Sequence, residues 1–488
     1  MVVRKRQDGG ERRAGMGTIN SALSIVTQSL DADQQALNVV ANNVANANTP
    51  GYTEETPKWQ ENQPLNIDGV TIGQGVTETG ATSERDRVLE SRLDQQQQLA
   101  SASGSRLTAL NTLQALFTPD LGSSSSTAGD IGSDITIFFN SFSSLEANPT
   151  DNALRQSVLS TAGTLAGDVS NAAASLDSQR SALDQEAAGV TSQVNSLTSA
   201  IAQLNQQIQT ISPDADAGTL EDQRQNDLSQ LSQLIGINQI TTENNGLAIT
   251  TTSGQLLLSG GTSYQLTTGT VNGVTDFFVS NTDVTSELAT GGGSLGGYLT
   301  ARDQDIPGAL NSLDQLAYSI STEINTQNNA GTDLDGVTGT VAGPLYIFSQ
   351  PTVVTGSAAS MSVVMTDPNQ IAAAGAGNGT GDNSNAVAMA AMANQAIVNG
   401  QTPTNYYSSF VARLGSTVSG VQTENTAQNA SVTQLQTQNN ALSGVNLNDE
   451  ASSMTTLERS YQAASQVFAM LNTVMAAALN LGDQTAVS

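Results

Sequence analysis

The sequence predicts a mainly α-helical, elongated multi-domain protein with a small antiparallel β domain inserted near the middle of the chain. Three observations support this fold class. Helical apolar periodicity marks both ends of the chain, and long polar helical tracts fill much of the 488-residue sequence between them. One central stretch, residues 237–293, changes to Thr, Ser, Gly and Asn with alternating apolar residues, which is typical of short hairpin strands.

The N-terminal helix is predicted to run from Ile19 to Val44. Apolar residues recur there at steps of four and three, the a/d spacing of a coiled coil, with Asp33 as the one polar residue in the row. The row consists of Ile19, Leu23, Val26, Leu30, Asp33, Leu37, Val40 and Val44. The Asn-rich residues that follow and the Pro50-Gly51 turn end the helix, because Asn and Pro are poor helix formers.

The C-terminal helix, from Met454 to Ala478, carries a second uninterrupted row at steps of three and four. Its members are Met454, Leu457, Tyr461, Ala464, Phe468, Leu471, Met475 and Ala478. An isolated helix of this length is rarely stable in water, so each end of the chain requires a partner. We therefore expect the two ends to form a coiled coil with each other, with copies of themselves, or both.

The segments between the two ends follow from the same patterns. Residues 53–80 contain several Pro and Gly and predict an extended connector with at most one hairpin. A third seam, from Val190 to Ile211, again has heptad spacing. Residues 340–367 are strand-like. Helices are predicted over residues 83–117, 135–145, 152–211, 220–234, 296–329, 384–397 and 406–442.

These elements predict a nested domain order. Residues 16–60 with 445–488 form the terminal coiled-coil assembly domain. Residues 61–236 with 294–444 form a long helical domain with minor β structure, and residues 237–293 form an outward-facing β insert. Residues 1–15 are basic and lack the apolar segment of a signal peptide, so we expect a disordered or mis-assigned start before Met16.

Composition excludes several function classes. The net charge of −28 argues against nucleic acid and anionic membrane surfaces as partners, because both require basic patches. The chain has no Cys and no His, which excludes thiol nucleophiles, a Ser-His-Asp triad and the usual zinc sites. No apolar run reaches the roughly 18 residues of a transmembrane helix. We therefore expect no enzyme activity and no cofactor.

Three short motifs resemble chemical sites only weakly. Asp333-Leu334-Asp335-Gly336 has the first spacing of a calcium loop without its later ligands, and a turn is the simpler interpretation. The Gly-rich residues 375–381 match no phosphate-binding spacing and predict a linker before a helix. The carboxylate pairs Asp303/Asp305 and Asp449/Glu450 lack convergent partners and predict solvated charges or first-turn charges of a helix.

The terminal segments resemble the bacterial flagellar axial family of rod, hook and hook-associated proteins. The N-terminal resemblance lies in Asn42-Asn43-Val44-Ala45-Asn46 followed by Thr49-Pro50-Gly51-Tyr52-Thr53. The C-terminal resemblance lies in residues 443–451 and 461–463, which are most similar to the hook-associated members that join hook to filament. Internal stretches agree, among them Phe138-Phe139-Asn140 and Gly293-Ser294-Leu295-Gly296-Gly297.

The resemblance implies a structural subunit of the flagellum that forms the hook–filament junction by stacking of its terminal helices. It further implies export unfolded by the flagellar type III apparatus with an export chaperone, and a secreted, extracellular location. The implied partners are copies of itself in a ring, hook protein below, and a second junction protein with the flagellin side above. The expected assembly interface comprises Leu23, Leu30, Leu37, Val44, Asn42, Asn43, Asn46, Gly51, Tyr52, Leu457, Tyr461, Phe468, Leu471 and Met475.

Three alternatives remain open from the sequence. A hook or distal rod protein would share the ends but have a different middle, and the internal seam with Gly444-Val445-Asn446-Leu447 favours the junction protein over it. A secreted adhesin-like binding protein would be expected to repeat its β domains, and the sequence contains no repeats. An inserted carboxylate hydrolase would need a larger insert with more acidic residues than residues 237–293 provide.

Overall fold

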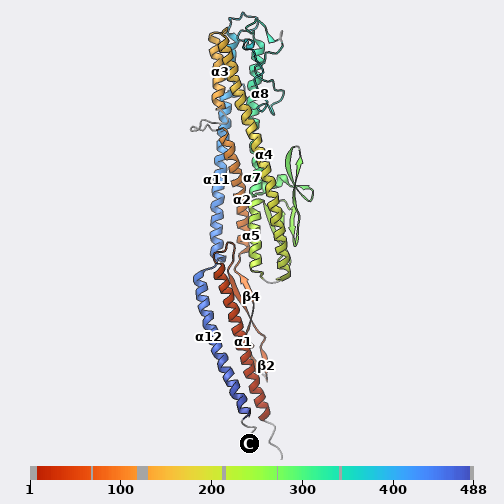
Figure 1. Ribbon diagram of the computed structural model, residues 1–488, viewed down its shortest axis with the longest axis vertical. Helices are drawn as coiled ribbons and strands as arrows, with labels where there is room; N and C mark the ends of the chain where they lie inside the picture. The colour runs from red at the N-terminus through yellow and green to blue at the C-terminus, as the bar shows by residue number, and fades with distance from the viewer. Residues whose placement is uncertain are drawn as a thin grey trace, which may run out of the picture.

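The computed structural model describes residues 8–67, 70–117, 130–211, 216–271, 273–339 and 343–483. The molecule is a long rod in which two helices pair at one end and a helical bundle continues above them (Figure 1). Small antiparallel sheets project to one side of the bundle. The prediction of a mainly helical, elongated protein with a β insert is confirmed.

The paired helices are α1 (Asp8–Asn46) and α12 (Leu447–Asp483), the first and last elements of the chain. They lie side by side along much of their length (Figure 1). α1 begins at Asp8 and so includes residues 8–15, which the sequence had predicted to lie outside the fold. Glu, Arg and Ala at positions 11–14 favour helix, and no proline separates them from Ile19. Residues 1–7 lie outside the described residues.

The connector after α1 forms one long two-stranded ribbon. β1 (Glu55–Glu61) pairs antiparallel with β4 (Val76–Ser83), and β2 (Leu65–Ile67) pairs with β3 (Val70–Ile72) between them. β1 and β4 both contact α1. Ala32, Ala36 and Val40 of α1 are consequently buried even though α12 covers only one face of the helix.

The helical bundle is built from segments of both halves of the chain. Its main members are α2 (Arg87–Ala115), α3 (Ile131–Ala147), α4 (Asn152–Ile211), α5 (Thr219–Leu234), α7 (Gly293–Thr300), α8 (Ile306–Ala330), α10 (Ser384–Ala391) and α11 (Pro403–Ser443). A π-helical turn, Ala301–Asp305, joins α7 to α8. The largest core lies where α3, α4, α8 and α10 meet, around Phe138, Phe139, Phe142 and Phe348. Aromatic rings there meet edge to face, the arrangement that the ring quadrupole favours.

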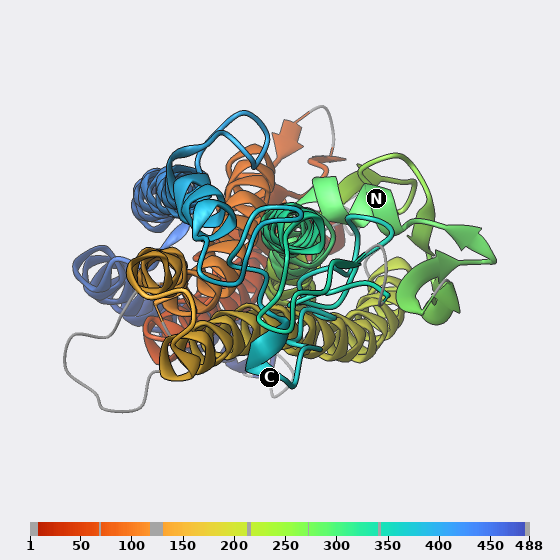
Figure 2. The same ribbon diagram turned by 90° about the horizontal axis from the view of Figure 1, so that it is seen from above.

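The β insert contains two sheets. One has the strand order β5 (Ile237–Thr241), β6 (Leu247–Thr251), β7 (Leu256–Ser259), β8 (Thr262–Ser263). The other has the order β11 (Thr282–Asp283), β10 (Val274–Val279), β9 (Leu266–Val271). Both lie to one side when the rod is viewed along its axis (Figure 2). The end of the predicted insert is helical instead, as α6 (Thr285–Gly291).

The third seam packs differently from the two terminal ones. Val190, Val194 and Ile201 of α4 are buried in a cluster that includes α5 and the inner faces of both sheets. A strip of heptad spacing therefore serves here as an ordinary core face rather than as a coiled coil. Ile211, at the end of this strip, is 68% exposed.

The prediction of strands over residues 340–367 was only partly correct. In the described part, residues 343–367, the backbone makes an isolated bridge between Phe348 and Val363 and no named strand. The side chain of Asn325 on α8 replaces a strand partner: its Oδ1 accepts from the Ile347 and Phe348 amides, and its Nδ2 donates to the Phe348 carbonyl at 2.8 Å. A buried amide side chain thus satisfies backbone groups that a sheet would otherwise pair.

Candidate assembly site

The two terminal helices meet along the predicted seam of α12. Leu457, Phe468, Leu471 and Met475 are partly buried, whereas Tyr461 is 38% exposed. One neighbouring helix covers only part of such a stripe, so the seam residues keep contact area that other surfaces can occupy. On α1 the seam residues Leu23, Leu30 and Leu37 are partly buried, and Val44 is 40% exposed.

A second apolar row runs along α12 beside the seam. Val467, Met470 and Val474 follow each other at steps of three and four and are 39%, 59% and 51% exposed. Ala463 and Ala477 extend the row at the same spacing and are also exposed. We call these five residues the outer row of α12. They share one face of the helix because steps of three and four return to the same side.

Asn43 is the hydrogen-bonding centre at the upper end of the helix pair. Its Oδ1 accepts from the Tyr52 hydroxyl at 2.8 Å and from the Glu55 amide at 3.0 Å. Its Nδ2 donates to the Glu55 carbonyl at 2.8 Å and to Glu450 Oε1 at 3.0 Å. One buried side chain therefore links α1, the connector and the first turn of α12.

The rest of the Asn-rich motif supports this centre. Asn42 Nδ2 donates to the Tyr52 hydroxyl, and Asn46 Nδ2 donates to Asn42 Oδ1 at 2.9 Å. Gly51 has φ +80°, a conformation that glycine adopts without strain, and it turns the chain from α1 into the connector. Burial first, and then the nearby charge of Glu55, raise the pKa of Tyr52, so the phenol keeps the proton that it donates.

Glu450 is not the solvated charge that the sequence predicted. It lies in the first turn of α12, as expected, but it is only 5% exposed and accepts from Asn43. Burial raises its pKa, and the hydrogen bond from Asn43 opposes that shift. The pair Asp303/Asp305 is also partnered: Asp305 accepts two bonds of 2.9 Å from Arg106, and Asp303 accepts from Arg302. Glu450, Asp303 and Asp305 therefore make structural contacts, whereas Asp449 is exposed, as predicted.

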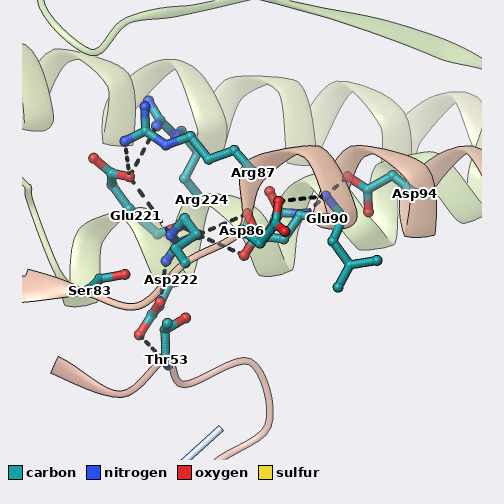
Figure 3. Close-up of polar contacts among 12 residues, drawn as sticks. Thr53, Ser83, Asp86, Arg87, Glu90, Asp94, Glu221, Asp222 and Arg224 are labelled. Carbon is teal, nitrogen blue, oxygen red and sulfur yellow. Dashed lines mark hydrogen bonds and ion pairs between the residues drawn. The ribbon is translucent and has the colours of Figure 1, made fainter. Parts of the chain in front are cut away.

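A buried ion-pair joint ties the connector to the helical bundle (Figure 3). Arg85, at the end of the connector, contacts Asp222 of α5 and Glu90 of α2. Asp222 also accepts from the Thr53 amide at 3.2 Å. Arg87 and Arg224 both reach Glu221. The joint comprises Thr53, Arg85, Arg87, Glu90, Glu221, Asp222 and Arg224.

Burial raises the pKa values of three carboxyl groups in and beside the joint. Burial raises the pKa of Glu90 to about 7, although the charge of Arg85 opposes the shift. Burial raises the pKa of Asp94 to about 6, although hydrogen bonds from Gln239 and Gln225 oppose the shift. Burial also raises the pKa of Asp222, again against Arg85. The pKa values rise because burial takes the charged forms out of water.

Sequence reasoning missed the joint entirely. Its members come from residues 53, 85–90 and 221–224, which are far apart in the chain. One signal was available: Arg85-Asp86-Arg87 and Glu221-Asp222 with Arg224 are dense charge clusters in a chain whose charged fraction is only 12%. Charged residues that concentrate at two places in such a chain indicate a contact between them.

The weak chemical motifs behave as turns. Asp333 Oδ1 accepts from the Asp335 and Val337 amides, which closes a local turn. Asp382 accepts from the Gly375 amide at 2.7 Å and from Ser384, which closes the Gly-rich loop before α10. These hydrogen bonds lower the pKa of Asp382. Each motif uses its carboxylate to satisfy backbone groups of its own loop.

Comparison with known proteins finds flagellar relatives of this chain. A model of flagella basal body rod proteins matches residues 27–53, and a model of the flagellar hook-associated protein FlgK helical domain matches residues 121–341. Flagellar hook-associated protein 1 of Escherichia coli K12 is 25% identical across 95% of this chain and 99% of that protein. The matches identify the chain as a flagellar hook–filament junction protein. The matched rod segment contains the Asn-rich motif on which the resemblance depended.

Further relatives are also named flagellar hook-associated protein 1. The Salmonella typhimurium LT2 protein of that name is 30% identical over 65% of this chain and 57% of its own length. The Bacillus subtilis protein is 24% identical over 94% of this chain and 97% of that one. The fold resembles the flagellar hook junction protein FlgK from Burkholderia pseudomallei, with TM-score 0.60 and 19% identity over 71% of this chain and 99% of that chain.

These findings confirm the main functional prediction. The chain is a structural component of the flagellar hook–filament junction and assembles with other flagellar proteins. Its relatives are structural proteins rather than enzymes. None of the helices among the described residues has the length and apolarity to cross a membrane.

Proposed function

We propose that this chain is exported unfolded by the flagellar type III apparatus with the help of a chaperone. It then joins copies of itself in a ring at the hook tip. Hook protein lies below this ring, and the second junction protein and the flagellin side lie above. The terminal domain, residues 16–60 with 445–488, makes the ring contacts, and the helical domain and its β insert face outward.

The observation that carries this proposal is the outer row of α12. α12 has two apolar rows at heptad spacing, and α1 covers only the seam. A helix with two such rows is suited to a layer in which it packs against a neighbour on each side. The helix pair also has few charges: α12 carries only Glu458 and Arg459 between residues 451 and 482. Little like-charge repulsion therefore opposes close packing of copies.

The outer row supplies a contact of useful strength. Full burial of Val467, Met470 and Val474 contributes roughly 1.5–3 kcal/mol per side chain before the loss of the part already buried. A ring repeats this contact between every pair of neighbours. Weak individual contacts then add up along the ring, so the assembly is stable although a single pair of subunits is not.

Two properties of the chain support export in an unfolded state. The sequence has no Cys, so no disulfide has to form or break during passage. The bundle is assembled from both halves of the chain, with α2 packed against α11. Its core therefore forms only after most of the chain has emerged. We also propose that the subunit has no catalytic role.

The double variant Met470→Asp with Val474→Asp tests the ring contact. In a strain that lacks the wild-type gene, we expect the variant to be exported but to leave hooks without filaments. Thr455→Asp with Gln462→Asp is the matched control, since it adds the same charge at two exposed polar positions of α12 outside the outer row. Filaments of normal number and length with the Met470/Val474 variant would reject the outer row as an assembly surface.

A further inference from the structure

A polar cavity lies directly beside the ion-pair joint. It has a volume of about 240 Å³ and lies between α2, α5, the lower end of α11 and the turn that precedes the connector. Tyr52, Asp94, Gln97, Gln225, Asn439 and Ser443 are among its lining residues. Almost every lining side chain carries oxygen or nitrogen. The cavity is therefore suited to a polar or charged occupant rather than to an apolar one.

Three oxygen atoms of the lining residues have no hydrogen-bond partner among the described residues. They are Asp94 Oδ1, Asn439 Oδ1 and Ser443 Oγ, and all three are buried. Asp94 as a residue is 1% exposed, and its other oxygen accepts from Gln225 and Gln239 at 3.0 and 2.8 Å. Unsatisfied buried acceptors are costly, which makes a ligand that interacts with oxygen favourable at this place.

The charges around the cavity do not balance. The joint together with Asp94 contains four carboxylates, those of Glu90, Asp94, Glu221 and Asp222, and three guanidiniums. Each of the other three carboxylates contacts an arginine within 4 Å, and Asp94 has no such ion pair among the described residues. Within this set, the one negative charge without a cationic partner therefore belongs to Asp94, which lines the cavity.

We propose that this cavity binds a calcium ion. The ligands are Asp94 Oδ1, Asn439 Oδ1 and Ser443 Oγ, and water molecules complete the coordination. Calcium accepts six to eight oxygen ligands, including amide oxygens and waters, in flexible geometry, whereas magnesium demands a small, nearly ideal octahedron. No group of three acidic, His or Cys ligands exists among the described residues, so affinity rests on one carboxylate with neutral oxygens. Such a site is weak, with a Kd of about 10⁻⁴–10⁻³ M, the range of extracellular calcium modules.

The position of the site gives the ion a structural role. Asn439 and Ser443 lie on one face of the last turn of α11, just before the chain enters α12. The Ser443 carbonyl also accepts from the Glu54 amide at 2.9 Å. An ion held between Asp94 of α2 and the end of α11 fastens the helical bundle at the level where the terminal helices begin. Calcium is therefore expected to stiffen the connection between the two domains.

Terbium luminescence tests this proposal in the full-length protein. Tb³⁺ takes the place of Ca²⁺ in oxygen sites, and Tyr52 in the cavity wall sensitises its emission. We expect saturable emission in excess Mg²⁺ that Ca²⁺ displaces with a stoichiometry of one. Asp94→Asn is expected to lower the affinity at least about tenfold, because it removes the only carboxylate among the three proposed ligands. Asn439→Ala is a second variant outside the bundle core, with an expected loss of several-fold.

The matched control is Asp333→Asn, which removes a carboxylate from the calcium-like sequence in the distant loop after α8. This control is expected to bind Tb³⁺ and Ca²⁺ as the wild type does. Emission that Ca²⁺ does not displace would reject the proposal and indicate diffuse binding to the acidic surface. Equal Ca²⁺ affinities in the wild type, Asp94→Asn and Asn439→Ala would reject it too. Circular dichroism of each variant confirms that the helices remain folded.

Discussion

Replacement of Asn43 by alanine is expected to detach the connector from the upper end of the terminal helix pair. The side chain makes four hydrogen bonds of 2.8–3.0 Å to Tyr52, Glu55 and Glu450. Alanine removes all four without disturbing α1, because it has the highest helix propensity. The effect is therefore confined to the contacts among α1, the connector and α12.

The free energy lost in the Asn43→Ala variant follows from these hydrogen bonds. At a net contribution of about 0.5–1.5 kcal/mol each, four bonds stabilise the contact by roughly 2–6 kcal/mol. The loss lies in the upper part of this range, because Asn43 is 1% exposed and its partners lose their bonds in a buried place. A loss of about 4.2 kcal/mol raises the open fraction of the connector about 1,000-fold.

Hydrogen exchange of peptides that cover residues 50–61 measures this opening, since the Glu55 amide donates to Asn43. Trp59, the only tryptophan of the chain, gives a second signal from β1 by its fluorescence in urea. Asn38→Ala is the control: it makes the same change at an exposed position of the same helix. Equal exchange rates in the two variants would show that Asn43 does not hold the connector.

Three further predictions concern the bundle and its joint. Arg85→Met leaves buried carboxylates without their partner and is expected to destabilise the protein by about 3–5 kcal/mol in urea denaturation, against about 0.5 kcal/mol for the exposed control Arg92→Met. Gly297→Ala places a methyl group against Ala102 O and Ser105 Oγ, so the melting temperature of the helical bundle should fall by several °C. Gly308→Ala has open space around the added methyl group, so the melting temperature should stay the same or rise slightly, because alanine favours helix. Burial raises the pKa of Asp94 from 3.8 to about 6, so folding favours its protonated form. With a chelator present, Asp94 contributes about 3 kcal/mol to the free energy of unfolding. This contribution is complete below the ordinary pKa of the carboxyl group and is lost as the pH rises through about 6. Asp94→Asn should flatten the decline in unfolding free energy between about pH 3.5 and pH 6.5.

Much of the helical framework could be predicted because its signals are local. The long helix α4 (Asn152–Ile211) matches the predicted range 152–211 in both limits. Its apolar periodicity, the proline at 149 before it and Pro213 after it are all readable from neighbouring residues. The terminal rows were readable for the same reason, and their heptad spacing indicated a helical partner before any contact was known.

The remainder depends on contacts that the sequence does not display. The joint brings Thr53, Arg85 and Asp222 together across more than a hundred residues. The segment after residue 343 has strand-like composition, but a side chain of α8 occupies the place of a partner strand. A strand is defined by its partner, so composition alone could not decide that case.

Electron microscopy of cells that lack this gene tests the central claim most directly, together with an assay for flagellin in the medium. The junction role predicts intact hooks without filaments and free flagellin in the medium, and wild-type gene expression should restore the filaments. Loss of the hooks as well would assign the protein to the rod or hook, and normal filaments would contradict a place in the flagellar axis.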